Sequence, residues 1–294
     1  MMWQQLKLQI NSAHVDFFEQ QLLDSGALSV TYLDAKDQPV FQKELGSTPM
    51  WDETFLIALF DEATDLQPLL VWLRNNPSLQ NADTLVIETI EDQAWERSWM
   101  ADFKAMQFGK RLWICPSWQT PPEPDAINII LDPGLAFGSG SHATTALCLE
   151  WLESADLAGK TLIDYGCGSG VLAIASVLLG AKSVLAVDND PQAIVATRAN
   201  SETNELPEHS LVACMPEAVP AMKADILLAN ILAEPLIELA PHFAELLLPN
   251  APIVLSGLLP EQAELVLAAY ADAFIMDAPR IEQQWVRLTG KRRP

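Results

Sequence analysis

The chain has 294 residues, half of them apolar by type, with 17 Lys and Arg against 39 Asp and Glu and a formal net charge of −22. The length suits one large domain or two ordinary ones. The charge argues against a groove that follows nucleic-acid phosphates, and no apolar run reaches the ~18 residues of a membrane-spanning helix.

The cysteines and histidines give no sign of a metal or disulfide framework. Four cysteines lack C-x-x-C spacing and four histidines are scattered, so we expect buried free thiols and no metal site. The amino terminus alternates in polarity and has no apolar block. We therefore expect a soluble, cytoplasmic protein that binds neither nucleic acid nor membrane.

The first 90 residues carry strand and helix patterns in turn. Apolar side chains recur at helical spacing over residues 15–22 and 66–73. Strand patterns occupy residues 5–10, 28–33, 54–60 and 84–90. This β-α-β-β-α-β order predicts an α+β ferredoxin-like domain over residues 1–90. The polar stretch 34–52 reads as a connection, with a short extra strand at 39–43.

Three aromatic residues mark the next segment. Trp95, Trp99 and Phe103 are four residues apart, so we predict a connector helix over residues 91–110 that packs against a neighbour. An approach of Trp99 to a ligand is the alternative. Residues 111–115 and 127–132 are predicted strands on either side of a proline-rich loop.

From residue 160 onward strand and helix patterns alternate, which predicts a mostly parallel sheet covered on both faces. Helices are expected to begin at about Val171, Pro191, Leu232 and Glu261. The seven predicted strands are 161–165, 183–188, 211–214, 225–230, 252–257, 273–278 and 284–290. The last two are too close for a crossover helix and predict an antiparallel hairpin at one edge. For the basic end, 280–294, a contact patch and a solvated tail are both possible, and we favour the tail.

A glycine-rich stretch follows the first strand of this alternating region. Gly166, Gly168 and Gly170 lie between a predicted strand and a predicted helix, where a sharp turn and close ligand approach both require glycine. Asp188 lies 22 residues beyond Gly166, close to the ~20 residues expected of a carboxylate that binds ribose hydroxyls. These residues favour adenosine binding over a purely structural turn. The third glycine is not at the spacing found in dinucleotide sites, so a nicotinamide-dependent oxidoreductase is the weaker alternative.

A second glycine-rich stretch, Asp132–His142, precedes that strand. We predict that it closes over the cofactor as a lid in which Phe137 is the apolar cover; a rigid turn with a buried Phe is the alternative. Thr145, in the first turn of the following helix, is positioned to bind a carboxylate of the ligand.

The Gly166 loop, together with Asp164 before it, resembles the class I S-adenosylmethionine-dependent methyltransferases. The stretches DPGLAFGSGSHATT, DYGCGSG, AVDNDPQAI, LLANILAEPL and LSGLL further resemble the PrmA family, the methyltransferases of ribosomal large-subunit protein eleven. The resemblance implies a seven-stranded class I methyltransferase (Rossmann-like) domain over residues 111–294, with residues 1–90 as the substrate-recognition domain. It also implies transfer of methyl groups from S-adenosyl-L-methionine to lysine side chains and α-amino groups of that ribosomal protein.

The resemblance also assigns roles to individual residues. Gly166 and Gly168 would lie beneath the cofactor, Asp188 would bind its ribose, and Asp164 would orient the loop. Asn230, at the end of the fourth strand, is the candidate catalytic residue. It is not followed by Pro-Pro-aromatic, which weakens a glutamine or nucleobase methyltransferase, and capping of the next helix is the alternative role. The predicted cofactor-binding residues are Phe137, Thr145, Gly166, Gly168, Asp188 and Asn230.

The proposed reaction is an in-line displacement by a neutral amine, for which the protein mainly supplies alignment and exclusion of water. The sequence offers no dedicated base, and none is assigned. We expect a monomer. A non-catalytic module that uses this fold only to dock a ribosomal protein is the remaining alternative.

Overall fold

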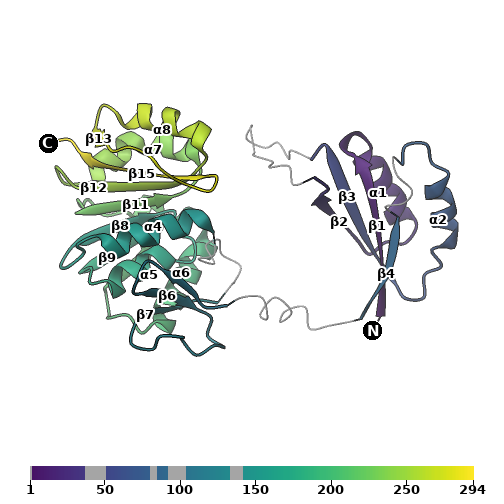
Figure 1. The fold of residues 1–294 in the computed structure, drawn as a ribbon, viewed down its shortest axis with the longest axis horizontal. Helices are drawn as coiled ribbons and strands as arrows, with labels where there is room; N and C mark the ends of the chain where they lie inside the picture. Colours follow the sequence, from purple (N-terminus) through teal and green to yellow (C-terminus); the bar gives the residue numbers. More distant parts are fainter. Residues whose placement is uncertain (1, 37–50, 80–84, 92–103, 133–141) are drawn as a thin grey trace. The chain divides into compact units, whose positions relative to one another are not determined.

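The computed structural model describes residues 2–36, 51–79, 85–91, 104–132 and 142–294 (Figure 1). The chain forms two compact units, Met1–Asp102 and Phe103–Pro294. The predicted strand at 39–43, the three aromatic residues of the predicted connector and residues 133–141 of the predicted lid lie outside the described residues.

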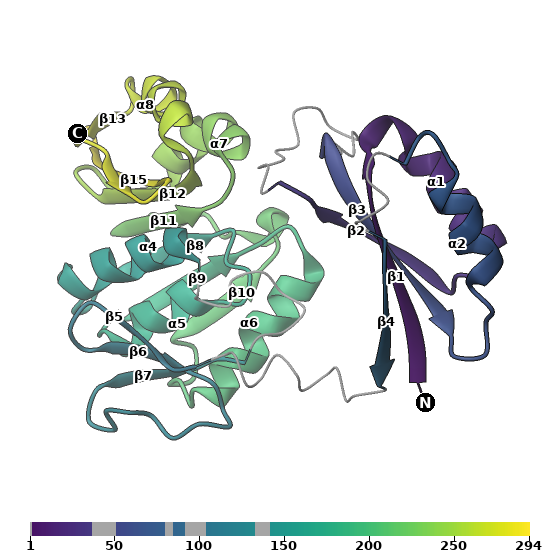
Figure 2. The ribbon, with the colours of Figure 1, turned by 45° about the vertical axis from the view of Figure 1, so that its right-hand side comes forward.

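The first unit is built on a four-stranded antiparallel sheet of order β2-β3-β1-β4. Its elements follow the predicted β-α-β-β-α-β order: β1 (Met2–Asn11), α1 (Val15–Asp24), β2 (Ser29–Asp34), β3 (Glu53–Asp61), α2 (Gln67–Arg74) and β4 (Val86–Glu91). The apolar stripes of both helices are buried against one face of the sheet, around Leu6, Leu8 and Phe60. Figure 2 shows both helices on that side.

The second unit is built on a large mixed sheet of order β10-β9-β8-β11-β12-β15-β13. The five strands from β10 to β12 run parallel to one another. Strand β15 is antiparallel to β12 and β13, the strands on either side of it in this order. The elements are α4 (Ala143–Ser154), β8 (Thr161–Tyr165), α5 (Val171–Leu178), β9 (Ser183–Val187), α6 (Pro191–Thr203), β10 (Leu211–Cys214), β11 (Ile226–Asn230), α7 (Ala233–Leu246), β12 (Pro252–Leu258), α8 (Ala263–Tyr270), β13 (Phe274–Met276) and β15 (Trp285–Arg292).

Helices cover both faces of this sheet. Side chains of α4, α5 and α6 share one core with alternate residues of the strands, such as Leu162 and Leu228. Side chains of α7 and α8 share a second core with the residues between them, such as Ile163 and Leu227. Burial on both faces explains the continuous apolar runs of these strands.

The predicted count of seven strands in this sheet is wrong, because an eighth, β14 (Arg280–Glu282), pairs with β15. Glu282 faces Trp285 across a two-residue turn in which Gln283 has a φ of +55°. Such turns usually contain Asn or Gly at positive φ. Gln283 and Gln284 gave no turn signal, and the strand is only three residues long.

The end of the predicted connector helix is also wrong. Residues 106–108 form β5 (Met106–Phe108), which belongs to a separate three-stranded sheet with β6 (Leu112–Cys115) and β7 (Ile127–Ile130). Phe108 is buried in the core that the strands share with α4, α5 and α6. The backbone of this short segment pairs with β6 as a strand. The helical spacing of the aromatic residues earlier in the chain does not extend this far.

The basic end is not a solvated tail, because most of it is strand β15. Its arginines hydrogen-bond to neighbouring elements: Arg287 donates to the Leu147 carbonyl at 2.8 Å, and Arg292 donates to the Ala244 carbonyl at 2.6 Å. Val286, Leu288 and Gly290 are buried and Arg287 and Thr289 between them are half-buried, so this segment is a strand of the sheet and not a free end.

The cysteines are free thiols, as predicted: Cys115, Cys148 and Cys167 are buried and Cys214 is partly buried. Burial raises the pKa of Cys148 to about 12 and raises that of Cys167 as well. In the described part of the chain, no helix is both long and apolar enough to cross a membrane.

Candidate active site

The site lies at the point where the strand order reverses. From β8 the chain proceeds through β9 to β10 on one side, then crosses to β11 and β12 on the other. The carboxyl ends of these parallel strands share one edge of the sheet, and α/β proteins bind ligands in the crevice outside such a switch point. The predicted residues Gly166, Asp188 and Asn230 all occur at or just beyond these strand ends.

The glycines after β8 adopt backbone conformations that other residues rarely take. Gly166, Gly168 and Gly170 have φ values of +79°, +54° and +81°. A Cβ on Gly166 would overlap Cγ2 of Ile231, and one on Gly170 would lie 2.8 Å from Cγ2 of Thr197. The loop therefore needs glycine for both its conformation and its packing.

Asp188, just after β9, is bonded directly to this loop. Its Oδ2 accepts a hydrogen bond from the Gly168 N–H at 2.8 Å, and its Oδ1 accepts one from the Asp190 N–H at 2.9 Å. Each carboxylate oxygen can accept more than one hydrogen bond. The structure thus holds the carboxylate rigidly while both oxygens keep capacity for ligand hydroxyls.

Asp164, in β8, has a buried carboxyl group in which one of the two oxygens accepts a hydrogen bond. Its Oδ2 accepts a hydrogen bond from the Ala173 N–H in the first turn of α5 at 3.0 Å, and within the described residues Oδ1 has no partner. Burial, with a smaller contribution from the charge of Asp188, raises the pKa of Asp164 to about 7. The bond to α5 agrees with a role in orienting the loop.

Thr145 and Asn230 are brought together although they are 85 residues apart. The Asn230 Nδ2 donates to Oγ1 of Thr145 at 3.3 Å, and Thr145 is buried in the first turn of α4. The alternative that Asn230 caps the next helix is wrong: the N-cap of α7 is Leu232, which makes no side-chain capping bond. With Nδ2 directed at the threonine, Oδ1 is the amide atom suited to accept an N–H.

The sequence analysis assigned no role to Gly257, which supports the backbone just after Asn230. Gly257 lies in β12 with a φ of +90°, and a Cβ there would overlap the backbone carbonyl of Ile231. Ile231 therefore packs between Gly257 and Gly166. The only signal was the glycine within the LSGLL stretch, which the resemblance included without a role.

Further contacts at the start of α4 join residues that the sequence analysis did not pair. His142 caps this helix, with its Nδ1 2.8 Å from Oγ1 of Thr144 and its ring 4.6 Å from that of Trp285. Oγ of Ser256 lies 3.3 Å from the Thr144 carbonyl and 3.1 Å from the Val286 carbonyl. These contacts fix α4 to β12 and β15, and nothing local in the sequence could have paired such distant residues.

Of the predicted lid, the structure describes only the two ends, and Phe137 lies outside the described residues. At the first end, the Asp132 carboxylate accepts hydrogen bonds from the Ser117 N–H and hydroxyl, both at 2.7 Å. At the other end, His142 begins α4. Both ends are thus anchored to the second unit.

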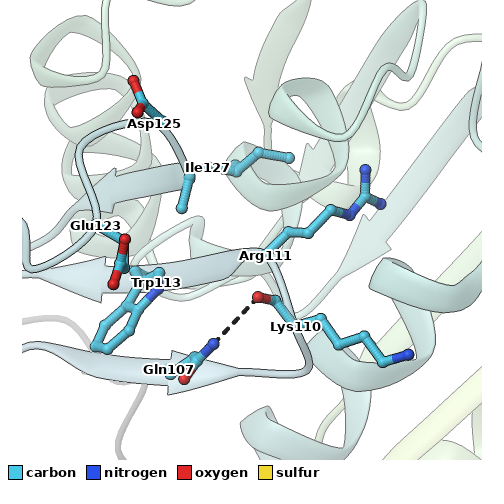
Figure 3. Close-up of a pocket in the computed structure, with 8 residues that line it drawn as sticks. Gln107, Lys110, Arg111, Trp113, Glu123, Asp125 and Ile127 are labelled. Atoms are coloured by element: carbon cyan, nitrogen blue, oxygen red, sulfur yellow. Dashed lines mark hydrogen bonds between the residues drawn. The ribbon is translucent and has the colours of Figure 1, made fainter.

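A depression of about 560 Å³ lies elsewhere, on the three-stranded sheet (Figure 3). Gln107, Trp113 and Glu123 line it, and the side chains of Lys110 and Arg111 extend on its other side. None of the predicted site residues borders it, and its lining mixes both charges. We assign the candidate site to the switch point, where the strand ends meet, and not to this depression. The described residues include no group of three or more His, Cys, Asp or Glu placed to hold a metal ion.

Comparisons with known proteins give a consistent result. The family model described as ribosomal protein L11 methyltransferase (PrmA) matches residues 2–293. A relative named ribosomal protein L11 methyltransferase from Shewanella amazonensis is 51% identical over 294 residues, covering 100% of this chain and 99% of the relative. One of the same name from Pseudomonas fluorescens is 49% identical over 296 residues, covering 100% of both.

A solved structure agrees with the fold. A ribosomal protein L11 methylase from Lactobacillus delbrueckii subsp. bulgaricus superposes with a TM-score of 0.60 at 34% identity, covering 65% of this chain and all of that one. The mixed sheet, its switch-point site and this likeness define a methyltransferase of the class I α/β type. The chain belongs to the ribosomal protein L11 methyltransferase (PrmA) family, whose model spans nearly all of it.

Proposed function

We propose that this protein transfers methyl groups from S-adenosyl-L-methionine to lysine side chains and α-amino groups of ribosomal protein L11. Family membership supports the reaction and the target. The observation that carries the site assignment is the meeting of two hydrogen-bonded pairs at one sheet edge, Gly168 with Asp188 and Thr145 with Asn230.

The residues at this edge fit S-adenosylmethionine. The three glycines after β8, which have positive φ, keep side chains out of the turn where the nucleoside would lie. The fixed carboxylate of Asp188 suits two ribose hydroxyls. The first turn of α4, with Thr145, offers a hydroxyl and N–H groups to the methionine carboxylate. Phe137 would cover the cofactor from the lid. When bound, the sulfonium supplies an activated methyl group.

We assign Asn230 to the incoming amine as well as to the cofactor. Its Nδ2 is bonded to Thr145, so Oδ1 would accept an N–H from the amine and aim the nitrogen lone pair toward the methyl group. Alignment of this kind contributes more than acid–base chemistry when the donor is already activated. A lysine with a pKa of ~10.4 must lose its proton on entering the site, which desolvation favours.

The first unit has the strand order and the element order of a ferredoxin-like fold, and we propose that it recognises the protein substrate. Its own core supports independent folding. Joined by the segment around residues 91–110, such a unit would present different amines of one target to a single site. We further propose that the enzyme acts as a monomer in the cytoplasm.

The test is radiolabel transfer from S-adenosylmethionine to purified ribosomal protein L11, followed by mass mapping of the modified amines. We expect labelled lysines and a labelled amino terminus, and Asn230→Ala should label far more slowly. Absence of transfer despite cofactor binding would contradict the proposal and favour a docking module. Calorimetric titration that detects NAD and not S-adenosylmethionine would favour the oxidoreductase alternative.

A further inference from the structure

A buried carboxyl group lies beneath the candidate site and has no part in the reaction proposed above. Asp164, in β8, is 1% exposed, and in the sheet register its neighbours are Ala186 of β9 and Leu228 of β11, both fully buried. Within the described residues, its Oδ1 has no hydrogen-bond partner. Buried polar atoms in native proteins are nearly always paired, so an unpaired carboxyl oxygen at a ligand site calls for a functional explanation.

The strand order places Asp164 beneath the middle of the proposed cofactor. Strand β8 lies between β9, which Asp188 follows, and β11, which ends at Asn230 beside Thr145. A cofactor with its ribose on Asp188 and its methionine carboxylate at Thr145 would cross the end of β8. In S-adenosylmethionine the sulfonium lies between the ribose and the methionine carboxylate. Asp164 is two residues before Gly166, and so its carboxyl group lies under that crossing.

We propose that Asp164 is the counter-charge of the sulfonium: its carboxyl group is neutral in the free enzyme, loses its proton when S-adenosylmethionine binds and regains one when S-adenosylhomocysteine remains. The inference rests on the proposed function. On binding, the O–H bond of the carboxyl group breaks and the proton passes to solvent. Methyl transfer then removes the positive charge from the sulfur, and the carboxylate takes a proton back from solvent. The carboxyl group and the cofactor sulfur together therefore carry no net charge in either complex.

The groups that face Asp164 favour its neutral form in the free enzyme. Burial, with a smaller contribution from the charge of Asp188, raises the pKa of Asp164 to about 7, and the Ala173 N–H of α5 offsets part of this effect. The thiols of Cys148 in α4 and Cys167 in the loop are themselves buried, which raises their pKa values and keeps them uncharged. Because charges interact strongly in a low-dielectric interior, a nearby sulfonium would shift this balance toward the carboxylate.

Isothermal titration calorimetry of the full-length enzyme at pH 6, 7 and 8 tests this coupling. Below the pKa of Asp164, each bound S-adenosylmethionine must displace a proton. Its Kd should therefore fall about tenfold from pH 6 to pH 8 relative to Asp164→Asn, whose side chain cannot titrate. The α-amino group of the ligand titrates with both enzymes, so this comparison removes its effect. For S-adenosylhomocysteine, which carries no sulfonium, wild type and Asp164→Asn should show the same pH dependence.

A matched control and a second measurement accompany the variant. Asp225 accepts a hydrogen bond from the Thr161 N–H at the opposite end of β8 at 2.9 Å, so Asp225→Asn should keep the wild-type pH dependence of cofactor affinity. Proton release by the wild type needs no variant. Calorimetry at pH 6 in two buffers of different ionisation enthalpy should show release of close to one proton per S-adenosylmethionine, and no such release with S-adenosylhomocysteine.

Each result has a distinct meaning. A wild-type enzyme that binds no S-adenosylmethionine at any of these pH values would refute the proposed function. Binding without proton release, and with the same pH dependence in wild type and Asp164→Asn, would overturn the role of Asp164 alone. Equal proton release with both ligands would show that the sulfonium charge does not drive the titration, and would also overturn the inference.

Discussion

Asp188 illustrates how one side chain links a loop to a ligand site. Its two oxygens hold the N–H groups of Gly168 and Asp190, so its position is fixed before any cofactor arrives. Preorganisation of this kind reduces the entropy lost on binding.

We expect Asp188→Ala to weaken S-adenosylmethionine binding by about 1–3 kcal/mol, because ribose hydroxyls lose their carboxylate acceptor. Asp190→Ala is the matched control: Asp190 caps α6 through the Gln192 N–H at 2.8 Å, so it should reduce stability and spare affinity. Isothermal titration calorimetry measures both. Equal affinity in wild type and Asp188→Ala would contradict the ribose assignment.

The raised pKa of Asp164 predicts that the stability of the protein depends on pH. The folded-state pKa is about 7 against an ordinary value of 3.8. Between these pH values the folded protein holds a proton that the unfolded chain has lost, so the free energy of unfolding falls as pH rises. Asp164→Asn cannot titrate and should lack this slope. Its stability relative to wild type should increase by about 1–4 kcal/mol from pH 4 to pH 8.

Urea unfolding without cofactor at several pH values measures this difference. Asp225 provides a contrast of opposite sign, because the Thr161 N–H lowers its pKa. Asp225 therefore adds to the free energy of unfolding at pH values above the ordinary carboxyl pKa, and this contribution is lost only in more acidic solution. Parallel pH curves for wild type and Asp164→Asn would show that the buried carboxyl does not titrate in this range.

At the scale of elements, the turn after β11 is held by its neighbours. Ile231 follows Asn230 and packs between two glycines, Gly166 after β8 and Gly257 in β12. The contacts of Ser256 with Thr144 and Val286 fix the start of α4 to the same strands. The relative positions of Asn230 and Thr145 therefore depend on how β8, β11, β12 and α4 pack.

Gly257→Ala should displace this turn. The substitution combines left-handed backbone strain with overlap of the Ile231 backbone, whereas Gly180→Ala, at a φ of +107°, meets nothing within 4 Å. We expect Gly257→Ala to be less stable than Gly180→Ala by about 1–3 kcal/mol and to lose methyl transfer, while Gly180→Ala keeps it. Denaturant unfolding and turnover measure the two effects. Equal stability and activity in both variants would exclude a supporting role for Gly257.

At the scale of the whole molecule, the two units have separate hydrophobic cores. A domain with its own core can fold alone. We expect a protein that starts at Phe103 to bind S-adenosylmethionine normally but to lose methylation of L11, because the recognition unit is missing. Calorimetry and radiolabel transfer measure these separately. Full activity of the truncated protein toward L11 would contradict the recognition role.

The sequence by itself determined the features that depend on local periodicity and turn chemistry. It predicted the alternating strands and helices from residue 160 onward, the helical stripes around Phe18 and Leu70, and the start of α5 after Gly170. These predictions are correct because an element that is buried on one face or on both carries apolar residues at a regular spacing in its sequence. The resemblance, carried by glycine stretches that few other residues could replace, identified the family correctly.

Only the tertiary structure decided which distant residues meet. Thr145 reaches Asn230 because α4 packs over β11, and Gly257 supports Ile231 because β11 and β12 are neighbours. Neither pairing leaves a local signature. The strand at 284–290 was predicted, but only the structure places it between β12 and β13 and binds Arg287 and Arg292 to neighbouring helices. Likewise, only the structure shows that both helices of the first unit pack on the same face of its sheet.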